Sequence, residues 1–129
     1  MPRPDAPPPP TIRLFVNDAV EEFRTGELLL GIEEEGVPVE VSRHAELDPL
    51  LLAHQAATAS VLGIGIGISL GYVVVTSERL DARRPYLARF LGAGYEEDRG
   101  VGANAARLVK RVPLIRLPPV DAKTGKGLS

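Results

Sequence analysis

Residues 63–69 alternate glycine with isoleucine and end in serine. In an extended strand successive side chains point to opposite faces, so Gly63, Gly65 and Gly67 share one face while three isoleucines share the other. The isoleucine face suits a packed core, and the glycine face admits the close approach of another backbone. A second β-branched run, residues 72–76, follows too soon for a helical crossover. The pattern therefore predicts an antiparallel hairpin within a sheet.

Helix and strand signals alternate around this hairpin. Asp18, with Glu21 three residues later, has the form of a capping box and predicts a helix over residues 19–35, which Gly36 and Pro38 end. Asp48 before Pro49 predicts a second helix, to about Ser60. Further strands are predicted at residues 12–16, 39–42, 86–91 and 112–115, and a further helix at residues 100–110.

These elements predict one α/β domain: a three-layer α/β/α arrangement with a mixed, mainly parallel sheet, spanning residues 11–117. Six of the 12 prolines lie in residues 1–10, which we expect to be a proline-rich disordered arm. Residues 118–129 contain few apolar side chains and are expected to be a flexible tail.

Composition excludes several classes of protein. With 129 residues the chain can bury a hydrophobic core that needs no disulfide or structural metal. The absence of cysteine excludes disulfide frameworks, thiol catalysis and thiolate zinc sites. The longest apolar run, residues 61–75, is interrupted by four glycines, so we expect neither a membrane span nor a signal peptide. A reducing cytoplasm is the expected location.

Charge is unevenly distributed along the chain. Residues 1–64 carry 11 acidic and 4 basic side chains, a net −7, whereas residues 65–129 carry 6 acidic and 11 basic ones, a net +5. Such a chain either attracts a partner of complementary charge or neutralises itself on folding. The aromatic content, 3 Phe, 3 Tyr and no Trp, disfavours a nucleic-acid surface.

The usual signatures of catalysis and cofactor binding are missing from the sequence. The glycines of residues 63–71 precede a strand instead of a helix, which is the wrong context for a dinucleotide loop. The two imidazoles, His44 and His54, have no spacing typical of a metal site, and no serine lies in a Gly-x-Ser-x-Gly elbow. We therefore predict no catalytic and no cofactor-binding residue.

Glu33, Glu34 and Glu35 occupy the last turn of the first predicted helix, where the helix dipole already presents negative charge. Either solvent and nearby arginines screen the three carboxylates, or the cluster binds a divalent cation or a basic surface of another protein. Neighbouring side chains on a helix point about 100° apart, so they cannot all meet at one ion. A single carboxylate is expected to complete a site whose other ligands come from elsewhere.

Two stretches carry a resemblance to a known family: Leu30-Gly31-Ile32-Glu33-Glu34-Glu35-Gly36-Val37-Pro38, and residues 102–110 followed by Val112-Pro113-Leu114. The glycine-rich strand of residues 63–69 lies between them, where the same family has a similar strand. In this order, over about residues 11–117, they resemble the small subunit of the diol/glycerol dehydratase reactivating factor, a relative of the dehydratase medium subunit. Glu35 stands where the family pattern has glutamine.

The resemblance implies a non-catalytic subunit without a cofactor of its own. Its expected partner is a large subunit with an actin-like ATPase fold, in a hetero-tetramer of two large and two small subunits. The expected client is adenosylcobalamin-dependent diol/glycerol dehydratase, from which the factor releases damaged cobalamin by subunit swapping. ADP or ATP belongs to the large subunit in this family, in the cytoplasm or in a bacterial microcompartment.

The same resemblance assigns site residues. Position in the Gly-x-Glu-Glu-x-Gly-Val-Pro motif marks Glu34 as the ligand of Mg²⁺ at the interface with the large subunit, and Glu33, Glu34 and Glu35 as partner-binding residues. Two alternatives remain open: the medium, cobalamin-contacting subunit of the dehydratase itself, and a free-standing flavodoxin-like sensor of a small molecule. Only about ten residues precede the first predicted strand, whereas a medium subunit usually has a longer N-terminal extension.

Overall fold

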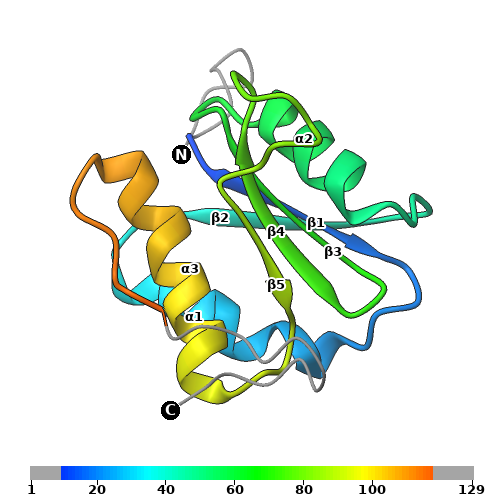
Figure 1. Ribbon diagram of the computed structural model, residues 1–129, viewed down its shortest axis with the longest axis horizontal. Coiled ribbons are helices and arrows are strands. Elements are labelled where there is room, and N and C mark those ends of the chain that lie inside the picture. Colours follow the sequence, from blue (N-terminus) through cyan, green and yellow to red (C-terminus); the bar gives the residue numbers. More distant parts are fainter. Residues whose placement is uncertain (1–9, 118–129) are drawn as a thin grey trace, which may run out of the picture.

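The computed structural model describes residues 10–117, which form a five-stranded sheet in the order β2-β1-β3-β4-β5 (Figure 1). The strands are β1 (Ile12–Asn17), β2 (Val39–His44), β3 (Ile64–Ser69), β4 (Tyr72–Ser77) and β5 (Leu87–Phe90). β1 pairs in parallel with β2 and β3, while β4 pairs antiparallel with β3 and β5. The predicted mixed sheet and the β3–β4 hairpin are confirmed.

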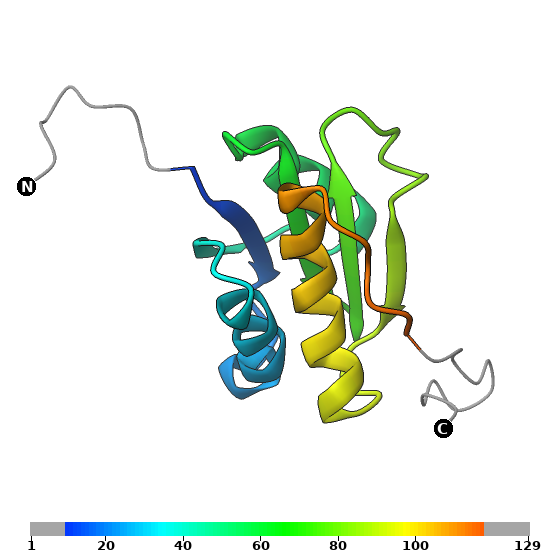
Figure 2. The same ribbon diagram turned by 90° about the vertical axis from the view of Figure 1, so that its left-hand side faces the viewer.

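Helices cover both faces of the sheet. The short helix η1 (Glu22–Thr25) leads into α1 (Gly26–Glu34), and α1 and α3 (Tyr95–Lys110) cover one face, while α2 (Pro49–Ala59) covers the other (Figure 2). The predicted three-layer arrangement is therefore confirmed. None of these helices is long and apolar enough to cross a membrane, within the residues that the structure describes.

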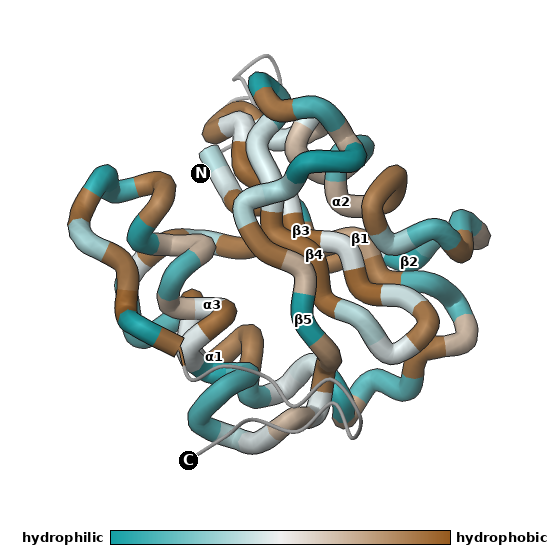
Figure 3. Tube along the Cα trace, viewed as in Figure 1, coloured by the Kyte–Doolittle hydropathy of each residue, from teal (hydrophilic) through white to brown (hydrophobic). Residues whose placement is uncertain are grey.

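The main core lies between the sheet and the α1–α3 layer, and Figure 3 shows hydrophobic residues concentrated on the central strands. The three isoleucines of β3 lie in this core, as the alternating pattern predicts. They pack with buried side chains from the other elements, chiefly Ile12, Leu14, Val16, Leu28, Ile32, Val73, Val75 and Val101.

The glycine face of β3 receives α2. A methyl group on Gly65 would overlap the backbone nitrogen of Ala57, and one on Gly67 would lie 2.8 Å from the carbonyl oxygen of Pro49. The helix backbone therefore lies directly on the strand, with Ala53 buried at the contact. Asp48 accepts a hydrogen bond from the backbone N–H of Leu50 at 2.9 Å, which confirms the predicted start of α2.

The first predicted helix begins later than expected. Asn17, not Asp18, accepts a hydrogen bond from the backbone N–H of Ala19 at 2.9 Å and holds a turn, so the short 3-10 helix η1 starts only at Glu22 and the α-helix at Gly26. The predicted capping box is wrong because the Asn17 side chain stabilises a turn at this point, and neither η1 nor α1 has a side-chain cap. At the other end Gly36 has φ +77°, which confirms the predicted glycine stop.

Two predictions near the C-terminus are also wrong. α3 starts at Tyr95 instead of residue 100, because the acidic residues that follow Tyr95 suit a helix N-terminus. Residues 112–115 form no strand. Ile115 instead exchanges two hydrogen bonds with the buried Asn104 side chain, at 2.6 and 2.9 Å, so its backbone lies against α3 and not in the sheet. The predicted arm, apart from Pro10, and the predicted tail lie outside the described residues.

Candidate metal and partner site at the end of α1

Two glycines let α1 and α3 pack backbone to backbone. A methyl group on Gly31 would overlap the carbonyl oxygen of Arg99, and one on Gly102 would overlap that of Leu28. This close contact places side chains at the edges of α3 directly against the glutamates of α1. Both glycines belong to the two motifs that carry the family resemblance.

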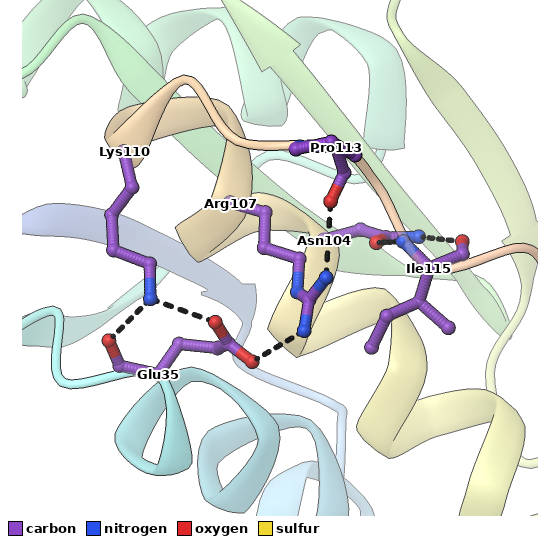
Figure 4. Close-up of polar contacts among 6 residues, drawn as sticks. All are labelled: Glu35, Asn104, Arg107, Lys110, Pro113 and Ile115. Atoms are coloured by element: carbon purple, nitrogen blue, oxygen red, sulfur yellow. Dashed lines mark hydrogen bonds and ion pairs between the residues drawn. The ribbon is translucent and has the colours of Figure 1, made fainter.

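Glu35 is engaged within the chain (Figure 4). Its carboxylate lies 2.8 Å from Nζ of Lys110 and 3.3 Å from Nη2 of Arg107, and its side chain is only 16% exposed. Lys110 also donates to the Glu35 carbonyl oxygen at 3.0 Å, which compensates one of the free carbonyls at the helix end. The hydrogen bond from Lys110 holds the pKa of Glu35 below its ordinary value, with a further contribution from Arg107.

Replacing Glu35 with glutamine, the residue of the family pattern, should lower the melting temperature by a few degrees at pH 7. The pKa of Glu35 is lower in the folded state than its ordinary value of 4.5. The charged carboxylate therefore stabilises the fold above about pH 4.5, and this stabilisation disappears as the pH falls through the lowered pKa. Thermal denaturation from pH 7 to pH 2.5 should show the two proteins converging at the acidic end. Glu33→Gln, an equal charge change at an exposed site, is the control, and a difference between Glu35→Gln and the native chain that persists at pH 2.5 contradicts the charge argument.

Glu34 has a different environment. Its side chain is 58% exposed, and its nearest cation is Nη1 of Arg99, 3.6 Å from Oε1. It lines a depression at the surface together with Glu96, Glu97 and Arg116. Its carboxylate is therefore open to solvent and to another molecule.

Glu33 faces away from this depression. It is exposed and lines a groove beside β2, together with Leu29, Val37, Val39 and Val41. The structure thus separates Glu33, which lies toward β2, from the other two. Glu34 and Glu35 line the same depression, where Glu34 is open and Glu35 is held by α3. Their assignment as partner-binding residues stays a prediction.

These contacts also bring together charges from the acidic and the basic halves of the chain. Glu27, Glu34 and Glu35 from the acidic half pair with Arg99, Arg107 and Lys110 from the basic half. Part of the imbalance is therefore neutralised where α1 meets α3. Sequence reasoning missed these three basic residues as site residues, although two of them lie in the second motif, because their partners are about 70 positions away.

The histidines form no metal cage. His44 lies at the end of β2, where its ring stacks on Phe15 with centroids 3.9 Å apart and its Nε2 lies 2.8 Å from Oγ of Ser42. His54 lies on α2. Within residues 10–117 no three His, Cys, Asp or Glu side chains gather where they could hold a metal. Among these residues, therefore, no ready-made metal cage surrounds Glu34.

Comparison with known proteins places the chain in a family. The model of the dehydratase medium subunit family matches residues 9–115, and the chain belongs to this family. Within it, the similar curated proteins are small subunits of reactivating factors. The propanediol dehydratase-reactivating factor small subunit of Salmonella typhimurium is 36% identical, with 81% of this chain and 89% of that protein covered. The diol dehydratase-reactivating factor small subunit of Klebsiella michiganensis is 39% identical, with coverage of 81% and 82%.

Two solved structures of reactivating factors contain chains similar to this one in fold. A chain of the diol dehydratase-reactivating factor complexed with ADP and Mg²⁺ superposes with a TM-score of 0.79 at 36% identity, covering 83% of this chain and 98% of that one. A chain of glycerol dehydratase reactivase gives 0.80 at 34% identity, covering 84% and 98%. The resemblance drawn from the two motifs is confirmed, and these relatives favour a reactivating-factor small subunit over a subunit of the dehydratase itself.

Proposed function

We propose that this chain is the non-catalytic small subunit of an ATP-dependent reactivating factor. Its client is adenosylcobalamin-dependent diol or glycerol dehydratase, from which the factor releases damaged cobalamin. The observation that carries this proposal is the match over nearly the whole domain to small subunits of such factors, in sequence and in fold.

Glu34 is the proposed link to the partner, a large subunit that binds ADP or ATP. Mg²⁺ prefers oxygen ligands and is commonly held by one or two carboxylates together with phosphates. Within residues 10–117 the exposed Glu34 carboxylate belongs to no cluster of three metal-ligating side chains, which fits such a shared site, since the partner and its nucleotide then supply the rest. One structural relative belongs to a factor complexed with ADP and Mg²⁺, which supports the same assignment.

The shared fold explains how such a subunit acts without chemistry of its own. The chain belongs to the dehydratase medium subunit family, so it and the corresponding dehydratase subunit can occupy equivalent places on their partners. In the proposed cycle nucleotide releases the small subunit, the freed surface of the large subunit engages the dehydratase, and damaged cobalamin leaves. We place this cycle in the cytoplasm or a bacterial microcompartment, with two large and two small subunits in the factor.

The test is the mass in solution of this chain mixed with an actin-like large subunit, with Mg²⁺ and with ADP, ATP or no nucleotide. Size exclusion with light scattering should show a stable complex that loosens with ATP. If no complex forms in any condition, the proposal is wrong. Co-elution with the large and small dehydratase subunits, with dehydratase activity, would instead identify a medium subunit.

A further inference from the structure

Arg99 is shared unequally between two carboxylates of α1. Its Nη2 and Nε lie 2.6 and 3.0 Å from Oε2 of Glu27, whereas its Nη1 lies 3.6 Å from Oε1 of Glu34. The first contact is a pair of charge-assisted hydrogen bonds, and the second is an ion pair beyond hydrogen-bonding distance. The side chain of Glu27 is 27% exposed, that of Arg99 43% and that of Glu34 58%, so the group runs from a shielded end to an open end.

The contacts with Glu27 determine how close the positive charge of Arg99 lies to Glu34. Two hydrogen bonds to Glu27 hold the guanidinium of Arg99 on the Glu27 side and keep it from closing onto Glu34. Glu27, Arg99 and Glu34 together carry one net negative charge. Arg99 forms its short contacts with Glu27, so the carboxylate of Glu34 remains available to a cation. A positive charge nevertheless stays close enough to repel a cation arriving at Glu34.

We propose that Glu27 and Arg99 are positioning residues that set the affinity of Glu34 for a divalent cation: Arg99 opposes cation binding, and Glu27 limits that opposition by holding Arg99 away. The inference rests on the proposed role of Glu34 at a shared Mg²⁺ site. It adds two residues of this chain that do not touch the ion.

The proposal makes predictions of opposite sign for two substitutions. Arg99→Gln removes the cation beside Glu34, so Mg²⁺ should bind more tightly. Glu27→Gln removes the group that restrains Arg99, which then pairs with Glu34 as its remaining carboxylate partner among these three, and Mg²⁺ should bind more weakly. Exposed ion pairs have modest energies, so each change should be about two- to fivefold.

The measured quantity is the Mg²⁺ concentration that gives half-maximal assembly with the large subunit at constant ADP, by size exclusion with light scattering. Arg99→Gln should lower it about two- to fivefold, and Glu27→Gln should raise it by a similar factor. Both remove the same short contact, so a purely structural effect would move both in one direction. The exposed residues Arg83 and Glu21 supply charge-matched controls as Arg83→Gln and Glu21→Gln, which should leave the midpoint unchanged. Melting curves of each variant alone verify folding.

Glu34→Gln distinguishes a failure of the inference about Arg99 and Glu27 from a failure of the proposed role of Glu34. If it abolishes the Mg²⁺ dependence while Arg99→Gln and Glu27→Gln shift the midpoint in the same direction or not at all, the inference about Arg99 is wrong and the role of Glu34 stands. Equal shifts in the charge-matched controls also overturn the inference. If Glu34→Gln leaves the Mg²⁺ dependence native, the role of Glu34 and the inference are both wrong.

Discussion

Replacing Gly65 with alanine should destabilise the domain by about 3 kcal/mol or more, since overpacking of a well-packed contact costs roughly 1–3 kcal/mol and occasionally more. The added methyl group would meet the backbone nitrogen of Ala57, the carbonyl oxygen of Ala53, 2.6 Å away, and the carbonyl carbon of Ala56 at the same distance. All three are backbone atoms of α2, so no side chain can rotate to make room. The whole helix must shift from the sheet, and urea denaturation should show a markedly lower midpoint.

Gly26 provides the matched control. It starts α1 with helical backbone angles, and a methyl group there would meet no atom within 4 Å. Alanine is a better helix former than glycine, so Gly26→Ala should be neutral or stabilise by up to about 1 kcal/mol. If Gly65→Ala and Gly26→Ala have equal stability, close packing of α2 on β3 is not what the glycines of the strand provide.

Replacing Glu34 with glutamine should weaken Mg²⁺-dependent assembly with the large subunit on the order of tenfold or more. Even the loss of a group that only supports a metal ligand reduces metal affinity 10- to 100-fold, and a neutral amide is a poorer ligand than a carboxylate. The domain itself should remain folded, because Glu34 is mostly exposed and its ion pair with Arg99 is long. Titration of assembly with Mg²⁺, set against the melting temperature of the isolated chain, measures both effects.

The neighbouring glutamates are the controls for this experiment. Glu33→Gln makes the same charge change one residue away, on the side of α1 that faces the groove beside β2, and should leave the Mg²⁺ dependence intact. Glu35→Gln should lower stability without removing the metal dependence, because its carboxylate is already held by Lys110 and Arg107. Equal losses in all three variants would mean that total charge matters and not a metal ligand at Glu34.

Sequence patterns identified most of the secondary structure because local chemistry determined it. The glycine–isoleucine alternation gave β3 and its two faces, Asp48 with Pro49 gave the start of α2, and Gly36 gave the end of α1. The errors arose where long-range contacts took over. Residues 112–115 have the composition of a strand, yet the side chain of Asn104 satisfies the backbone of Ile115, and that partner cannot be read from local propensity.

The site shows the same division. Helical periodicity alone establishes that Glu33, Glu34 and Glu35 point in different directions, and the motif selected Glu34 by resemblance. Only the packing of α3 on α1, which Gly31 and Gly102 permit, brings Arg107 and Lys110 to Glu35 and Arg99 between Glu27 and Glu34. The sequence by itself determined most of the elements, the α/β class and the acidic helix end, because these depend mainly on neighbours within a few residues. The tertiary structure decided which carboxylate is neutralised and which stays open, because that depends on charges about 70 residues apart in the chain that meet only after folding.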